Sequence, residues 1–132
     1  MKTNVLLVDD SKLLRAANSH LLAKAGYEVS VASDGEEGLR LACENHPDLI
    51  LLDMLLPKMA GQDVLRALKA NPDTAKIPVV VVTGLSQKNE EKLRKEGAAA
   101  FLEKSVLELD KQGTSLIQLV GTVLRESGEG NT

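Results

Sequence analysis

The feature that most limits what this chain can fold into is a repeated alternation of short apolar runs with amphipathic segments. Three runs of four residues contain no polar side chain: Val5–Val8, Leu49–Leu52 and Val79–Val82. Continuous runs of this length are typical of strands that are buried on both faces, as in a parallel sheet. Tyr27–Ala32 alternates instead, which favours a strand nearer an edge, and Ala99–Leu102 is a fifth, weaker strand.

Helical patterns fill the segments between these runs. The first follows Ser11, a residue that can cap a helix, and ends at Gly26. Asp34 can cap the second, which carries acidic residues at its positive end. The other three helices are expected around Val64–Leu68 with a stop near Asn71-Pro72, from Gln87 to Glu96, and from about Thr114.

A strand followed by a helix therefore occurs five times, which predicts an α/β fold with a parallel sheet and helices on both faces. The 132 residues are the length of one ordinary domain. We expect this domain to span residues 1–126 and the polar, Gly-rich residues 127–132 to be a disordered tail or a cut linker. In such a sheet, ligands bind beyond the carboxyl ends of the strands.

Composition argues against several classes of protein. Hydrophobic residues make up 43% of the chain and charged residues 27%, as in a globular domain with a real core. A net charge of −3 and an aromatic content of 2% argue against a nucleic-acid partner. The one cysteine, Cys43, excludes an internal disulfide, and its helical context predicts a buried or half-buried position. We see neither a signal peptide nor a membrane-spanning run, and expect a cytoplasmic protein without a membrane partner.

Three aspartates follow the ends of two predicted strands. Asp9 and Asp10 come directly after the first strand, and Asp53 follows the third. If these strands are neighbours, the three carboxylates share one crevice, where mutual repulsion raises their pKa values unless a cation neutralises them. Carboxylate oxygens suit a hard divalent cation, and so small a number of protein ligands favours Mg²⁺ over Ca²⁺. One such aspartate would be a cap or turn residue, but three together predict a metal site.

Two other predicted strands end in groups that complement these carboxylates. Thr83 closes the fourth strand with a hydroxyl, and Lys104 closes the fifth with an ammonium. The metal and Lys104 would neutralise charge on a transferring phosphoryl group, and Thr83 would bind one of its oxygens. Aspartate carboxylates can act as nucleophiles that form aspartyl phosphates. The set therefore suits phosphoryl transfer onto a carboxylate.

At these positions the sequence resembles the response-regulator receiver family, best known from the stand-alone chemotaxis regulator. The resemblance spans about residues 3–125 and implies a flavodoxin-like, doubly wound, five-stranded parallel sheet of order 2-1-3-4-5 with five helices. It rests on an ordered set of motifs at strand ends: Val8-Asp9-Asp10-Ser11, Asp34-Gly35, Leu52-Asp53-Met54 with Pro57 and Gly61, Val82-Thr83-Gly84, and Phe101-Leu102-Glu103-Lys104.

The resemblance implies that Asp53 is the phosphoacceptor and one of the Mg²⁺ ligands. It implies that Asp10 binds Mg²⁺ directly, that Asp9 binds it through water, and that the backbone carbonyl of Leu55 completes the protein's ligands. Lys104 is the matching catalytic cation.

The resemblance also implies a switch. Thr83 matches the switch hydroxyl, and the small Gly84 beside it leaves room for a phosphoryl group. Phe101 matches the aromatic residue that turns inward when Thr83 is drawn to the phosphoryl group. The alternative for Phe101 is a plain core residue.

Three features depart from the family pattern. Ser105 stands where the family usually has proline; a cis bond costs about 2.5–4 kcal/mol here against about 0.5–1 before proline, which leaves the placing of Lys104 open. The loop at Val106–Gly113 is longer than the family norm, which we interpret as a specificity feature. Leu55 and Leu85 are apolar where many relatives carry polar groups that orient a water molecule, so we expect slow self-dephosphorylation.

Three other readings are weaker. A haloacid-dehalogenase-like hydrolase needs an acid two residues after its nucleophile, where this chain has Leu55. A flavodoxin-like cofactor binder needs a phosphate-binding loop after the first strand, where this chain has Asp9 and Asp10. A dinucleotide-binding site needs a GxGxxG motif after a strand, and no predicted strand in this chain is followed by one. A phosphorylation-independent docking module with the receiver fold, or a receiver cut from a larger regulator, stays open.

The sequence thus predicts a phosphoacceptor of two-component or phosphorelay signalling rather than a turnover enzyme. A sensor histidine kinase or histidine phosphotransfer protein is the expected donor, and Asp53 attacks its phosphohistidine with Mg²⁺ present. The added charge, about −1.5 to −2 for phosphorylated side chains, draws in Thr83 and Lys104 and changes a protein-docking face. The downstream target is a protein that the sequence does not name.

Overall fold

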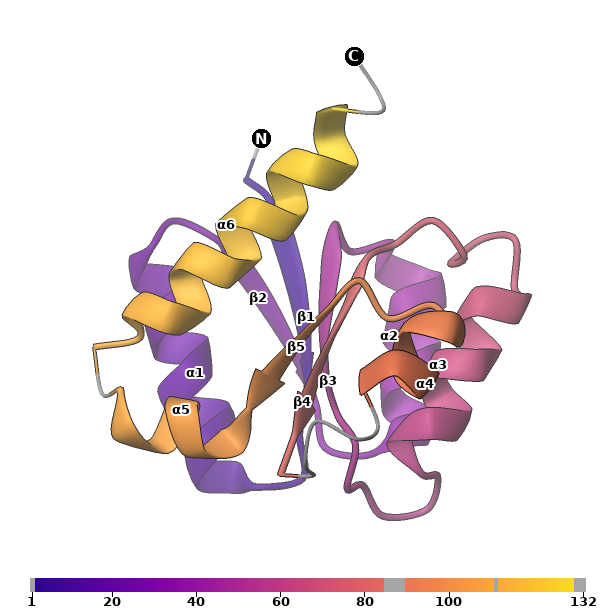
Figure 1. The fold of residues 1–132 in the computed structure, drawn as a ribbon, viewed down its shortest axis with the longest axis horizontal. Coiled ribbons are helices and arrows are strands. Elements are labelled where there is room, and N and C mark those ends of the chain that lie inside the picture. The colour runs from indigo at the N-terminus through magenta and orange to yellow at the C-terminus, as the bar shows by residue number, and fades with distance from the viewer. Residues whose placement is uncertain (1, 85–89, 111, 130–132) are drawn as a thin grey trace.

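The continuous apolar runs form the middle of a parallel sheet that lies between two layers of helices (Figure 1). The computed structural model describes residues 2–84, 90–110 and 112–129. The strand order is β2-β1-β3-β4-β5 and all four pairings are parallel, which confirms the flavodoxin-like order. The strands are β1 Asn4–Val8, β2 Glu28–Ala32, β3 Leu49–Asp53, β4 Val79–Thr83 and β5 Ala100–Glu103.

Burial along the strands explains why the apolar runs are continuous. Every residue of β3 and β4 is buried, because helices cover both faces of these central strands. β2 lies at the edge of the sheet, as its alternating sequence predicts, and its Val31 is 43% exposed.

The helices are α1 Lys12–Lys24, α2 Gly35–Asn45, α3 Gly61–Ala70, α4 Glu90–Lys95, α5 Lys104–Leu109 and α6 Thr114–Glu129. Both predicted caps are confirmed. Ser11 Oγ accepts a hydrogen bond from the Leu14 N–H at 3.3 Å, and Asp34 Oδ1 accepts one from the Glu37 N–H at 2.9 Å. The Glu37 side chain accepts a hydrogen bond from the Ser33 N–H at 3.0 Å, so both Asp34 and Glu37 bond backbone N–H groups at the start of α2.

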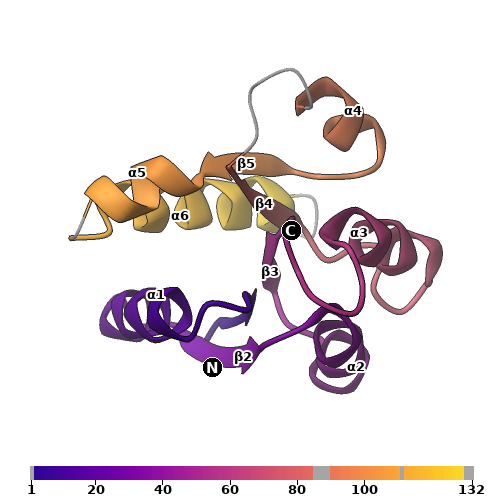
Figure 2. The ribbon, with the colours of Figure 1, turned by 90° about the horizontal axis from the view of Figure 1, so that it is seen from below.

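The sheet separates two apolar clusters, because successive strand residues point to opposite faces (Figure 2). Leu6 and Val8 of β1 pack in the cluster beneath α2, α3 and α4. Val5 and Leu7 of the same strand pack in the cluster beneath α1 and α6. With a helix layer on each face, a ligand is expected beyond the carboxyl ends of the strands.

Three details differ from the sequence predictions, and one predicted helix is described only in part. The described residues hold six helices rather than five, because α5 occupies the first half of the segment expected to be a long loop. Without proline at 105, nothing prevents Lys104 from adopting helical backbone angles. The predicted helix over Gln87–Glu96 is seen as α4, and its predicted beginning, residues 87–89, lies outside the described residues.

The other two differences concern α6 and Cys43. Helix α6 continues to Glu129, beyond the predicted boundary at 126, and residues 130–132 lie outside the described part of the chain. Cys43 is exposed, because the buried Ala42 faces the sheet and Cys43 lies beside it on the outer side of α2. Among the described helices, none has the length and apolar character needed to cross a membrane.

Candidate functional site

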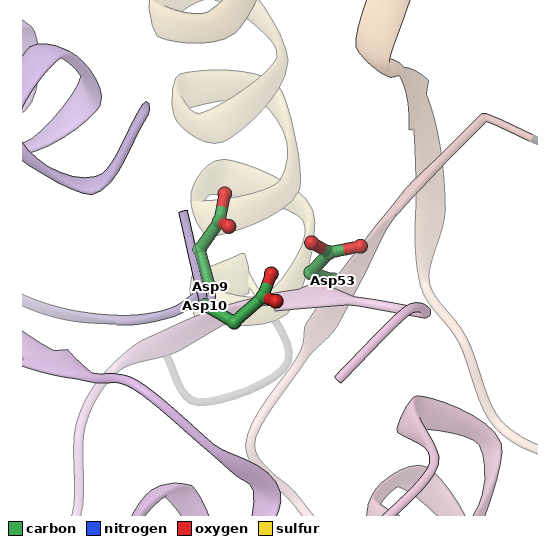
Figure 3. Close-up of side chains that lie close together, drawn as sticks. All are labelled: Asp9, Asp10 and Asp53. Atoms are coloured by element: carbon green, nitrogen blue, oxygen red, sulfur yellow. The ribbon is translucent and has the colours of Figure 1, made fainter. Parts of the chain in front are cut away.

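The carboxyl ends of β1 and β3 bring three aspartates together (Figure 3). These strands are direct neighbours, and Val8 pairs with Leu52, so the residues that follow them emerge side by side. Carboxylate oxygens of Asp9, Asp10 and Asp53 all lie within 4.8 Å of one another. Asp53 is 1% exposed and Asp9 is 3% exposed, whereas Asp10 is open to solvent.

Backbone amides fix two of these carboxylates. Asp9 Oδ1 accepts a hydrogen bond from the Ser11 N–H at 2.8 Å, and Asp53 Oδ1 accepts one from the Leu55 N–H at 3.0 Å. Both bonds reach two residues ahead, which is the pattern of an Asx-turn. The main chain of Asp9 is held as well, because its carbonyl accepts a hydrogen bond from Arg15 at 2.9 Å. The sequence therefore orients these side chains through the turns that they themselves form.

Lys104, the first residue of α5 and the one directly after β5, reaches the same cluster. Its Nζ lies 2.9 Å from Asp53 Oδ2, while the two side chains are 22% and 1% exposed. Among the described residues, the ion pair with Lys104 is what compensates the buried Asp53 Oδ2. The Lys104–Ser105 peptide bond is trans.

Within the part of the chain that the structure describes, the negative charges of the cluster are not fully balanced. Burial raises the pKa of Asp9, the Ser11 N–H opposes that rise, and the nearby Asp53 carboxylate adds to it. Burial lowers the pKa of Lys104, but its contacts with Asp53 and the neighbouring carboxylates outweigh burial, so that pKa is raised overall. One ammonium among three carboxylates leaves two negative charges, and the donor set of oxygens matches what a hard divalent cation binds.

Thr83 and Phe101 lie on neighbouring strands next to this cluster. Thr83 is the last residue of β4 and is 6% exposed, and Phe101 of β5 is half-buried. The register pairs Val81 with Phe101 and Thr83 with Glu103. Because alternate residues share a face, Thr83 and Phe101 are diagonal neighbours on the same side of the sheet.

The space around the site is bounded by small or apolar residues. A Cβ atom added at Gly84 would meet nothing within 4 Å, so the backbone beside Thr83 borders open space. Leu55, two residues after Asp53, is 63% exposed. Leu85, the second apolar residue singled out in the sequence, lies outside the described residues.

The backbone at Asp53 and Met54 passes very close to Gly61, which explains the glycine better than its sequence motif alone does. A Cβ atom at this position would lie 2.5 Å from the Asp53 carbonyl oxygen and 2.6 Å from Met54 Cα. The Gly61 N–H also donates to the Met54 carbonyl at 3.1 Å. Helix α3 therefore begins directly against the backbone that carries the Asp53 side chain.

Sequence reasoning missed a link between two loops at this edge. Lys58 Nζ lies 3.5 Å from Asp34 Oδ2 and joins the loop after β3 to the loop after β2. The pKa of Asp34 is lowered, first by the Glu37 N–H and then by Lys58. Lys58 has a φ of +67°, in the left-handed region that favours asparagine and glycine. Asparagine or glycine at this position would have indicated the turn in the sequence, whereas lysine does not.

Comparison with known proteins decides the family. The sequence model described as "Response regulator receiver domain" matches residues 5–112. The chain belongs to the response regulator receiver family. The receiver is a signalling domain of two-component systems, and the resemblance noted from the motifs is confirmed.

Individual relatives agree with this assignment. The polar-differentiation response regulator DivK of Brucella ovis is 37% identical over 107 residues, which cover 80% of this chain and 87% of that protein. The solved structure of the Vibrio cholerae chemotaxis protein CheY4 is 30% identical, covers 93% of this chain and 99% of that chain, and has a TM-score of 0.83. A CheY-like receiver from Methanospirillum hungatei is 25% identical with a TM-score of 0.87, and covers 98% of this chain and 99% of that chain.

Proposed function

We propose that Asp53 is the phosphoacceptor of this receiver. The observation that carries the proposal is the meeting of three carboxylates within 4.8 Å, with the Lys104 ammonium 2.9 Å from the most buried of them. An oxygen of Asp53 would attack the phosphorus of a phosphohistidine, so that an O–P bond forms as the N–P bond breaks. The imidazole leaves with the bonding electron pair and takes a proton from solvent. Asp53 is held for this attack by the Leu55 N–H.

The residues present fit a magnesium ion. Asp10 and Asp53 would bind it directly, Asp9 would bind it through water, and the Leu55 carbonyl would complete the set. When bound, Mg²⁺ neutralises negative charge on the transferring phosphoryl group. Lys104 supplies a second positive charge from the protein itself, and its raised pKa keeps it protonated near neutral pH.

The new charge on Asp53 would be read by Thr83 and Phe101. A phosphoryl group brings strong acceptor oxygens, and the Thr83 hydroxyl on the neighbouring strand is a donor for one of them. Movement of Thr83 changes the space next to Phe101 on the same face. A protein partner would then read the surface formed by α4 and β5. A sensor histidine kinase or a histidine phosphotransfer protein is the proposed donor.

The test is intact-mass measurement after incubation with acetyl phosphate. Wild type with Mg²⁺ should gain one phosphoryl group, whereas wild type without Mg²⁺ and Asp53→Asn with Mg²⁺ should gain none. Lys104→Gln should fold, bind Mg²⁺ and phosphorylate more slowly. No gain in any sample would contradict the proposal and favour a docking module that works without phosphorylation.

We also infer that the phosphorylated form is long-lived. Leu55 stands at the rim of the site with 63% of its surface exposed, and its side chain cannot position a water molecule for attack on the phosphoryl group. The phosphoryl lifetime should shorten in Leu55→Asn combined with Leu85→Glu. An unchanged lifetime in that double variant would overturn the inference.

A further inference from the structure

Arg94 on α4 lies over the ring of Phe101. Its guanidinium carbon is 4.9 Å from the ring centroid, within the distance at which a cation and an aromatic face attract each other. Arg94 itself is exposed, while Phe101 is half-buried and packs against the apolar cluster beneath α2, α3 and α4. The ring therefore has one side against the core and one side that Arg94 covers.

The position of Arg94 is fixed by the residues on either side of it. Leu93 is buried in the same cluster that Phe101 contacts. Glu96, two residues after Arg94, accepts hydrogen bonds from Gln62 at 3.0 Å and from Arg66 at 2.8 Å, both on α3. Figure 2 shows α4 beside α3 on this side of the sheet. The guanidinium thus reaches Phe101 from a backbone that is anchored to the body of the domain.

Phe101 also lies next to the residue that would sense a phosphoryl group. Thr83 is its diagonal neighbour on the same face of the sheet, through the pairing of Val81 with Phe101. If the ring moves inward when Thr83 moves, it leaves the place where Arg94 covers it. The contact with Arg94 is then lost, while the anchors of Leu93 and Glu96 to the core and α3 do not need to change.

We propose that Arg94 is a positioning residue that holds Phe101 in its outer, half-buried position and so opposes the phosphorylation switch. The inference rests on the proposed function of Asp53 and adds a residue that sets how readily the switch occurs. A contact present in only one of two states shifts the equilibrium toward that state. By linkage, it weakens the binding of any ligand that favours the other state by the same factor.

The chain offers a direct readout, because it contains one phenylalanine. Protein labelled with 4-fluorophenylalanine has one ¹⁹F resonance, which reports the surroundings of Phe101. The probe for the switched state is beryllofluoride, a phosphoryl mimic, added with Mg²⁺. Three variants are compared with wild type: Arg94→Gln, which removes the cation; Arg94→Lys, which keeps a charge; and Lys95→Gln, which removes a neighbouring exposed cation.

Arg94→Gln should move the resonance of the free protein toward its beryllofluoride-bound position. It should also tighten apparent beryllofluoride binding by about two- to fivefold, the range that an exposed cation–π contact implies. Arg94→Lys should lie between Arg94→Gln and wild type, and Lys95→Gln should match wild type.

Three results would overturn the inference, and together they tell its failure apart from that of the proposed function. If wild type binds beryllofluoride and Arg94→Gln binds it equally or more weakly, Arg94 does not oppose the switch. If wild type binds no beryllofluoride, the phosphoacceptor proposal fails, and the inference that rests on it fails too. An equal shift in Lys95→Gln would show a general charge effect and would also overturn the role of Arg94.

Discussion

Helices α3 and α4 cover the same face of the sheet beside the proposed phosphoacceptor site, but they are held very differently. Helix α3 has ten residues, and four of them are buried, among them Val64, Leu65 and Leu68. Helix α4 has six described residues, of which Leu93 is the buried one. Helix stability in proteins comes mostly from packing of the apolar face, so α3 is part of the core and α4 rests on it.

The ends of the two helices differ in the same way. The first residue of α3 lies against the Asp53 backbone, and its last turn is tied by Lys69, whose Nζ donates to the carbonyls of Ala75 at 3.0 Å and Ile77 at 2.8 Å. The hydrogen bonds that link α4 to α3 are made by Glu96, the residue directly after the C-terminal end of α4. A domain that must keep its acceptor fixed and still change a surface needs one element of each kind.

The largest effect should come from removing a buried leucine of α3. Leu65→Ala should lower the free energy of unfolding by about 2–5 kcal/mol, because Leu65 is fully buried and the core of α3 cannot close around the cavity. Leu93→Ala in α4 should cost about 2 kcal/mol or less, since a short helix with one buried residue can shift to fill the space. Urea unfolding monitored by circular dichroism measures both, and equal losses would show that α4 is held as firmly as α3.

Gly61 and Gly84 form a second matched pair. Gly61→Ala should lower the free energy of unfolding by about 1–3 kcal/mol, because its Cβ would force the Asp53 and Met54 backbone to move. It should also slow phosphorylation by acetyl phosphate. Gly84→Ala, with open space around its Cβ, should change stability by about 0.5 kcal/mol or less. A stable Gly61→Ala variant would mean that the start of α3 gives way easily.

Thr74 tests how the end of α3 is held. In a continuing helix, the Leu68 carbonyl would accept a hydrogen bond from the N–H of residue 72. That residue is Pro72, which has no N–H, so the Thr74 hydroxyl donates to the Leu68 carbonyl instead, at 2.6 Å. Thr74 is 1% exposed, so Thr74→Val leaves that carbonyl buried and should cost about 1–2 kcal/mol. Thr74→Ser, which keeps the hydroxyl, is the control, and an equal loss in both variants would point to packing instead.

The smallest effect should come from Glu96. Glu96→Gln should lower the free energy of unfolding at neutral pH by at most about 1 kcal/mol, because Arg66 on the other side of the pair is half-exposed. Hydrogen bonds from Arg66 and then Gln62 lower the pKa of Glu96 below its ordinary value of 4.5.

The sign of the pH dependence follows from that lowered pKa. The contribution of Glu96 is fully present above the ordinary pKa of 4.5 and is lost as pH falls through the lower pKa of the folded protein. Urea unfolding of wild type and Glu96→Gln should therefore differ at pH 6 and converge toward pH 3. A difference that grows on acidification would contradict this.

Much of this arrangement could be predicted from local sequence. The strands Val5–Val8, Leu49–Leu52 and Val79–Val82 agree with β1, β3 and β4 to within one residue, because burial on both faces requires unbroken apolar runs. Once β1 and β3 are known to be neighbours, the positions of Asp9, Asp10 and Asp53 at strand ends are enough to predict that their side chains lie together. That adjacency came from the family resemblance, since no local pattern states which strands pair.

What could not be predicted depends on contacts between distant residues or on weak local signals. Glu96 lies 34 residues after Gln62, and neither residue shows in the sequence that they meet. The cover of Phe101 by Arg94 depends on how α4 sits, which the sequence leaves open. Helix α5 has six residues, and neither Glu103 at its N-cap nor Asp110 at its C-cap is a residue that typically marks that end of a helix. The local sequence therefore predicts a loop.

The strand order also has a consequence for the chain as it is made. Synthesis delivers β1, β2 and β3 first, and these three strands suffice to bring Asp9, Asp10 and Asp53 to one edge. Lys104, the cation that the protein itself offers to them, arrives only with β5, 51 residues after Asp53. Because a domain generally folds as a unit, the three carboxylates meet their lysine only after β5 and the residue that follows it have been made. The charge balance of the site is therefore completed by one of the last elements of the domain to be synthesised.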